Sequence, residues 1–253
     1  MAPYFSTEKR FTAAGVFQTS GLAVTCAILG LAFLFSPFPG RAALGADSAQ
    51  VAAAYRAVLA RNLDHARQWL AEGDVKSLAQ GTANMQLICD LYLTIGDDPR
   101  WQTSVKELRE RIDKLAAAAA EGDAKACAAA IERVDAALAA SGAAPPQGNR
   151  LSLDRAPALR RLMLVLDSVQ ADAKVAVLTG QAAAAKKQAV VLSELGRLVS
   201  NARRDDAFAA QSRAFVQAAE ALASADENDL ATVRQRLRSV AQRCDACHEG
   251  QRP

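Results

Sequence analysis

Short clusters rich in glycine and aspartate divide an alanine- and leucine-rich sequence into stretches of about twenty residues, and this spacing limits the fold more than any other feature. Within each stretch, apolar residues recur three and four positions apart, and runs of β-branched residues are few, as is typical of amphipathic α-helices. The sequence therefore predicts an all-α protein. The expected helices cover 48–71, 75–94, 99–119, 123–140, 152–178, 181–201, 205–224 and 228–248.

A segment containing paired prolines divides the chain into two halves of similar length. It covers residues 141–150 and includes Pro145, Pro146 and Gly148, which interrupt helical sequence. The halves on either side, 47–140 and 151–253, each contain four expected helices joined by short connections. Because such helices bury their apolar faces most economically against one another, we expect two tandem antiparallel four-helix bundles.

The last expected helix of each half carries the same apolar stripe. In the second half the stripe alternates three and four residues apart, and 106 residues earlier the first half repeats it. The second-half positions are Leu230, Val233, Leu237, Val240, Cys244 and Cys247, and the first-half positions are Ala124, Cys127, Ile131, Val134, Leu138 and Ser141. The stripe predicts that both late cysteines of the second half face the interior.

Residues 244–248 read Cys-Asp-Ala-Cys-His, the CxxCH pattern of c-type haem attachment. The two thiols bond to the haem vinyl groups, and the histidine that follows is placed to bind iron. We therefore predict one covalent haem c on Cys244 and Cys247, with His248 as the proximal iron ligand. The corresponding first-half residues are Leu138, Ser141 and Gly142, so no haem is expected there.

Two other chemistries also use a CxxC pair. A thiol redox pair is expected between a strand and a helix, which is not the context of this one. A zinc site needs four ligands, and the other histidine and cysteines after residue 46 lie in a different segment. Both alternatives remain open from the residues alone, although the histidine directly after the second cysteine favours haem.

The first 46 residues have the features of a secretory signal peptide. Lys9 and Arg10 precede an apolar stretch over 21–35, and small residues continue to Ala46. This predicts export to the periplasm. The alternative is an uncleaved membrane anchor, because the apolar stretch is close to the length of a membrane span.

Charge and motifs exclude several classes of function. Removing Lys9, Arg10, Arg41 and Glu8 with the signal peptide turns 30 basic and 27 acidic residues into 27 and 26. So balanced a chain predicts no nucleic-acid partner, and its net charge does not identify a redox partner protein. No acid–base pair, nucleophile arrangement or phosphate loop is recognisable, so enzymatic activity is not expected.

The second half resembles the cytochromes c′, exported four-helix haem proteins whose CxxCH lies near the end of the fourth helix. The resemblance covers nearly all of residues 151–252 and is strongest over Phe208–His248. A second matching piece runs from Arg160 to Leu164, and Arg252, four residues after His248, matches a basic residue common in the family. The first half looks like a degenerate, haem-free copy.

The resemblance implies that Arg160 lies near the haem propionates and that Leu164 covers the distal face of the iron. Leucine cannot ligate, so this register implies five-coordinate iron that binds a small gas such as nitric oxide or carbon monoxide. The alternative is a six-coordinate electron carrier in which Met163, placed on the interior seam by helical periodicity, is the sixth ligand. Family members often pair through their first helices, which implies a pseudo-dimer of the two halves or a homodimer.

Aromatic residues are concentrated in the first half. After residue 46, both tryptophans and both tyrosines occur there, at Tyr55, Trp69, Tyr92 and Trp101. Because protein interiors contain few voids larger than a water molecule, we expect these side chains to fill the volume that haem occupies in the other half. We expect His65 to be solvated or hydrogen-bonded rather than a ligand, and Cys89 and Cys127 to be free thiols.

Overall fold

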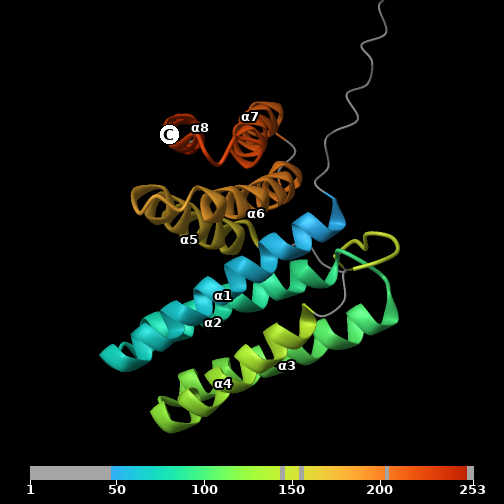
Figure 1. Cartoon of the computed structure of the whole chain (residues 1–253), viewed down its shortest axis with the longest axis vertical. Coiled ribbons are helices and arrows are strands. Elements are labelled where there is room, and N and C mark those ends of the chain that lie inside the picture. Colours follow the sequence, from blue (N-terminus) through green and yellow to red (C-terminus); the bar gives the residue numbers. More distant parts are fainter. Residues whose placement is uncertain (1–46, 143–145, 154–156, 203–204, 250–253) are drawn as a thin grey trace, which may run out of the picture. The chain divides into compact units, whose positions relative to one another are not determined.

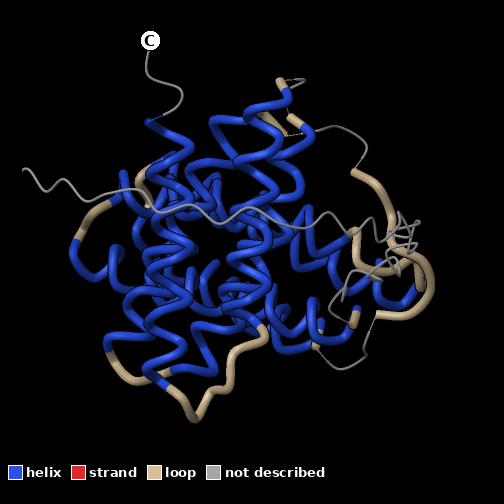
Figure 2. The backbone as a smooth tube through the Cα atoms, turned by 90° about the horizontal axis from the view of Figure 1, so that it is seen from above, coloured by secondary structure: helices blue, strands red, loops and turns tan. Residues whose placement is uncertain are grey.

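The computed structural model describes residues 47–142, 146–153, 157–202 and 205–249, and these residues contain eight α-helices and no strand (Figures 1 and 2). The all-α prediction is confirmed. The predicted signal peptide and Arg252 lie outside the described residues. The helices are α1 (Ser48–Glu72), α2 (Val75–Leu93), α3 (Pro99–Glu121), α4 (Ala124–Ser141), α5 (Leu159–Leu178), α6 (Ala182–Asn201), α7 (Asp206–Ala223) and α8 (Leu230–Glu249).

Glycine followed by aspartate ends one helix and begins the next. Gly73 and Gly122 both have φ 72°, the left-handed conformation that glycine adopts without steric cost at a helix C-terminus. Asp74 and Asp123 then cap the following helices, each accepting a backbone N–H bond from three residues on, at 3.0 Å and 2.9 Å. These local signals explain why the expected boundaries of the first-half helices lie within about two residues of the observed ones.

The fifth helix begins at Leu159, seven residues later than the predicted start at 152. Pro157 accounts for the difference, because proline disfavours helical conformation in the residue before it and donates no N–H. The chain before it packs on the α2–α3 turn, where the Leu151 N–H donates to the Thr94 carbonyl at 2.8 Å. Gly148, at φ 84°, lies so close to the Asp97 carboxylate that a side chain at this position would collide with it.

Within each half, helices that follow one another in the chain pack against one another. In the first half, α1 also packs against α4. In the second half, α8 packs chiefly on α7 and less extensively on α5 and α6. The two halves meet where α1 contacts α6 and α2 contacts α5.

The interior of the first half contains a cluster of three aromatic side chains. The ring centroids of Tyr55 and Tyr92 are 6.3 Å apart, and those of Tyr92 and Trp101 are 4.6 Å apart in an edge-to-face arrangement. All three side chains are buried. Burial raises the pKa of Tyr92, and a hydrogen bond with the Ser141 side chain partly offsets that rise. The cluster therefore reaches the end of α4, the place that Cys247 takes in α8.

Candidate functional site

The stripe of α8 faces the interior along its whole length, as the sequence predicts. Val233, Leu237 and Val240 are buried, and Cys244 and Cys247 are half-buried against the same core. The helix begins at Asp229, which caps it by accepting the Thr232 N–H at 2.9 Å. Because these residues are spaced three and four apart, one face of one helix leads from the core to both thiols.

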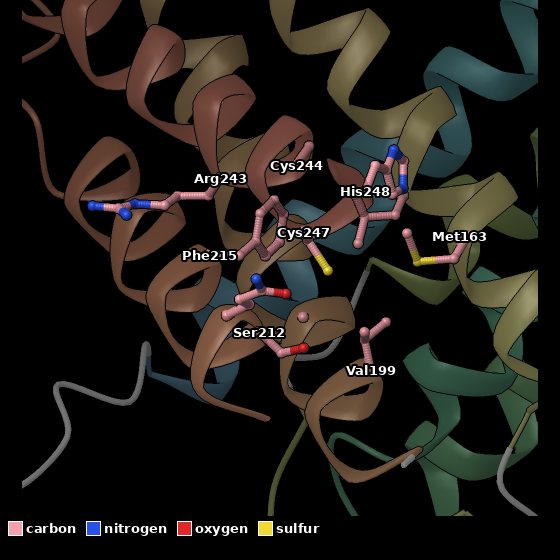
Figure 3. Close-up of a pocket in the computed structure, with 11 residues that line it drawn as sticks. Met163, Val199, Ser212, Phe215, Arg243, Cys244, Cys247 and His248 are labelled. Atoms are coloured by element: carbon pink, nitrogen blue, oxygen red, sulfur yellow. The ribbon is translucent and has the colours of Figure 1, made fainter. Parts of the chain in front are cut away.

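Both cysteines and His248 line a small pocket between α8 and the three other helices of the second half (Figure 3). The pocket is partly open, and the space within it that a water-sized molecule can reach is about 30 Å³. The walls are mostly apolar. The lining residues are Met163 and Leu166 of α5, Gly196 and Val199 of α6, Gln211, Ser212 and Phe215 of α7, and Arg243, Cys244, Cys247 and His248 of α8.

Two features of α6 and α7 distinguish the pocket beside the CxxCH residues. Gly196 lies under the Phe215 ring, and a Cβ added to it would approach that ring to 2.8 Å, so only glycine allows this close packing. The side-chain oxygen of Gln211 is buried in the pocket region with no hydrogen-bond partner among the described residues. Buried acceptors are rarely left unpaired unless a ligand or water completes them.

The donor set fits a c-type haem, with two thiols on the wall and an imidazole directly after them. The space is smaller than the macrocycle, so haem attachment requires the helices around the pocket to separate. The C-terminal end of α8 suits such a separation, because none of the described residues after Val240 is buried.

The Cys244 thiol has its pKa raised from 9.0 to about 11, first by burial and then by the nearby carboxylates of Asp167 and Asp245. Lys174 opposes this rise. Reactive thiols of dithiol redox motifs have lowered pKa values, because the thiolate is the nucleophile. The environment of Cys244 is therefore not that of an activated redox thiol.

Of the two candidates for the distal residue, Met163 and not Leu164 lies at the pocket. Leu164 is 41% exposed. On a helix each residue advances by about 100°, so Leu164 points almost opposite to the buried Leu162. The resemblance implies that Leu164 covers the distal face, whereas the structure places its neighbour Met163 at the pocket.

Arg160 lies one helical turn before Leu164 on the same outward side of α5 and is exposed. It does not line the pocket, so the structure does not bring it to Cys244 or Cys247. Arg252, the other basic residue implied by the family resemblance, is not among the described residues.

The remaining histidine and cysteines lie away from the pocket. His65 is hydrogen-bonded or ion-paired to Asp172, with its Nε2 atom 3.4 Å from the carboxylate, and packs on Trp69. Cys89 and Cys127 are buried free thiols, as predicted. No group of three or more histidine, cysteine or acidic side chains among the described residues is placed to share a metal ion.

Sequence reasoning missed the residues that α6 and α7 contribute. Gly196 is an isolated glycine within a helical pattern, which is a sign of close packing. Gln211 and Phe215 lie four apart on one face of α7, together with the buried Ser212. Neither signal identifies a cofactor pocket until the packing of α7 on α8 is known.

Comparison with protein-family models, with curated proteins and with solved structures finds no match to this chain. Among the described helices, none combines the length and the apolar character needed to cross a membrane.

Proposed function

We propose that the chain is an exported c-type haem protein with one haem attached covalently through Cys244 and Cys247 and with His248 as proximal ligand. The observation that carries this proposal is the convergence of both thiols and His248 on one apolar pocket between four helices. When bound, haem supplies an iron that binds small neutral gases and changes its charge by one electron. The chain holds the group by two thioether bonds, and apolar walls restrict water around it.

In this proposal the fold is two tandem antiparallel four-helix bundles, of which the second is of cytochrome c′ type. The closing contact of α1 with α4 supports the first bundle, and the pocket at the end of α8 supports the second. The matching burial of the α4 and α8 stripes supports an internal duplication. The predicted signal peptide over residues 1–46 would deliver the chain to the periplasm, where c-type haem is attached in bacteria.

Binding of a small gas such as nitric oxide or carbon monoxide is the first candidate activity. Most of its side chains are apolar, and no carboxylate is among the described residues that line it. Arg243 lines it beside His248, the proposed proximal ligand. We therefore infer ligand binding or electron transfer rather than enzymatic turnover.

The second candidate is a six-coordinate electron carrier, and the position of Met163 favours it. Its side chain lines the pocket together with His248 and comes from a different helix (Figure 3). A thioether on the iron would exclude gases and keep the same ligands in both oxidation states. A core methionine that only fills space would also lie here, so the two roles need an experiment.

The haem-free half would act as a permanent partner of the haem half, making the chain a pseudo-dimer. Polar contacts join the halves: Asp172 of α5 accepts from Arg61 of α1 at 3.5 Å, and Arg161 donates to the Ala83 carbonyl at 3.1 Å. The first half has its own aromatic core, so it can fill its interior without a cofactor. A homodimer of the whole chain is the alternative arrangement.

A pyridine haemochrome assay and an optical spectrum of the purified protein test the proposal. One haem per chain is expected, and none or two would contradict it. Five-coordinate high-spin iron that is unchanged in Met163→Leu supports gas binding. A low-spin spectrum that Met163→Leu converts to high-spin supports the electron carrier, and Leu164→Met provides the matched control at the neighbouring, outward position.

A further inference from the structure

The exposed surface of α8 carries positive charge on both flanks of the helix. From Leu230 to Arg243 the helix contains no acidic residue. Its four arginines are all exposed, and none forms an ion pair with a described carboxylate. We call Arg234, Arg236, Arg238 and Arg243 the arginine face. Acidic residues follow only at the end of the helix, at Asp245 and Glu249.

The corresponding helix of the haem-free half lacks these arginines. The positions 106 residues earlier are Ala128, Ala130, Glu132 and Ala137. Three consecutive stripe positions are buried in both helices, at Cys127, Ile131 and Val134 of α4 and at Val233, Leu237 and Val240 of α8, so this register is the one in which α4 and α8 correspond. The arginine face is therefore not a requirement of packing a fourth helix. It belongs to the half with the CxxCH pocket.

The arginine face lies beside that pocket. Arg243 lines it, and Arg236, seven residues earlier, lies on the same side of the helix. Arg234 and Arg238 are four apart on the other flank. These three earlier arginines are about 7–14 Å from Arg243 along the helix axis. None of these three arginines lines the pocket, and all three are exposed, so their side chains are available to a surface outside it.

We propose that the arginine face is the docking surface for an acidic protein that approaches the mouth of the CxxCH pocket. A guanidinium is planar, weakly hydrated and matches a carboxylate with two parallel hydrogen bonds. Complementary charge around a site also speeds the encounter of two proteins and orients them. What the partner does at the pocket rests on the proposed function, whereas the docking itself does not.

A protein fits this surface better than an anionic bilayer. The arginines occupy two opposite flanks of the helix, and a flat surface would reach only one of them at a time. The outermost positions between the flanks are polar, at Gln235 and Gln242. Helices that lie on membranes instead bury an apolar face in the lipid.

The test uses fluorescently labelled poly-L-glutamate as an acidic polypeptide probe and phosphatidylglycerol vesicles as the competing surface. Binding of the full-length protein is measured by anisotropy and by co-sedimentation at low and high salt. The test variant combines Arg234→Gln, Arg236→Gln and Arg238→Gln, which leaves the pocket-lining Arg243 in place. The matched control combines Arg100→Gln, Lys125→Gln and Arg133→Gln, which removes the same charge from exposed positions of the haem-free half.

We expect the α8 variant to bind poly-L-glutamate about tenfold more weakly at low salt, since it loses three exposed charge contacts. The control should bind as the unaltered protein does. Equal losses in both variants, or no loss in the α8 variant, would overturn the proposal. So would tighter binding to the vesicles than to poly-L-glutamate at matched anionic charge.

The failure of docking and the failure of the proposed function are distinguishable. The same binding measurement on Cys244→Ala/Cys247→Ala protein reports on the arginine face without attached haem. The haemochrome assay reports on haem without the probe. Circular dichroism of each variant checks that the helices are retained.

Discussion

The helices α4 and α8 carry the same apolar stripe, but only in α4 are the stripe residues buried up to the C-terminal end of the helix. Leu138 and Ser141 are 4% and 1% exposed, whereas Cys244 and Cys247, at the matching positions of α8, are half-buried around a pocket. The difference comes from the opposing helices. In the first half, aromatic rings lie opposite the end of the α4 stripe and fill the interior. The volume of the side chains opposite the stripe therefore decides whether the end of the fourth helix is buried or borders a pocket.

The largest expected effect is the loss of all covalent haem in Cys244→Ala/Cys247→Ala, because no other CxxCH exists in the chain. Haem that survives denaturation and acid extraction is the measurement. The matched pair Cys89→Ala/Cys127→Ala, which removes the two buried free thiols of the other half, should keep one haem. Retained haem in the first variant would break the contrast between α4 and α8.

Trp101→Ala should be the most destabilising single change in the first half, at about 3–5 kcal/mol, because it removes a large, fully buried ring next to Tyr92. Urea unfolding followed by circular dichroism measures this. Trp101→Phe should cost less, since the indole N–H has no hydrogen-bond partner to lose. Phe215→Ala should also cost less, because that ring already borders a pocket. Equal losses at Trp101 and Phe215 would mean that the second half is as tightly filled as the first.

Before haem is attached, stability should fall as pH rises above 9. The folded-state pKa of Cys244 is about 11, against 9.0 for an ordinary thiol, so the folded state retains a proton that the unfolded state releases. The contribution is therefore present below pH 9 and is lost as pH approaches 11. Urea midpoints at a series of pH values should show a shallower decline for Cys244→Ala. An equally steep decline would assign the loss to other groups.

Asp172→Asn should change stability at pH 7 by less than about 1 kcal/mol, with a small gain expected. Burial raises the pKa of this carboxyl, and the charges of His65 and Arg61 only partly oppose that rise. A raised acid pKa means that its contribution to stability is present at low pH and is lost as pH rises through that pKa. Asparagine at position 172 should remove this dependence on pH.

Asp135→Asn, at the exposed pair with Arg67, is the control and should show little change. A large loss in Asp172→Asn alone would show that the ion pairs outweigh burial.

The smallest expected effect tests the comparison most sharply. Building the motif into the first half with Leu138→Cys, Ser141→Cys and Gly142→His should add no second haem. The aromatic rings already fill the interior opposite those positions, and a side chain at Gly142 would meet Arg56. The haemochrome stoichiometry should therefore stay at one. A stoichiometry of two would show that missing cysteines, rather than filled volume, separate the halves.

Much of the secondary structure was predictable because its signals are local. The glycine–aspartate pairs at 73–74 and 122–123 end and begin helices through contacts within a few residues. The start of α5 was predicted too early because apolar periodicity continues before Pro157, whereas proline disfavours a helical conformation in the residue before it. The resemblance to a family named Leu164 for the distal face, and the structure places its neighbour Met163 at the pocket, because successive helical residues differ in direction by about 100°.

By itself, the sequence determined the helices, the stripe and the order of Cys244, Cys247 and His248 along one helix face, because each depends on spacing within a single segment. Only the tertiary structure decided which residues of the other helices surround the two thiols. Gly196, Gln211 and Met163 come from three different helices, and their meeting depends on how those helices pack rather than on any local pattern. Likewise, a nearly balanced net charge concealed the arginine face, because exposure and neighbouring carboxylates are properties of the folded surface.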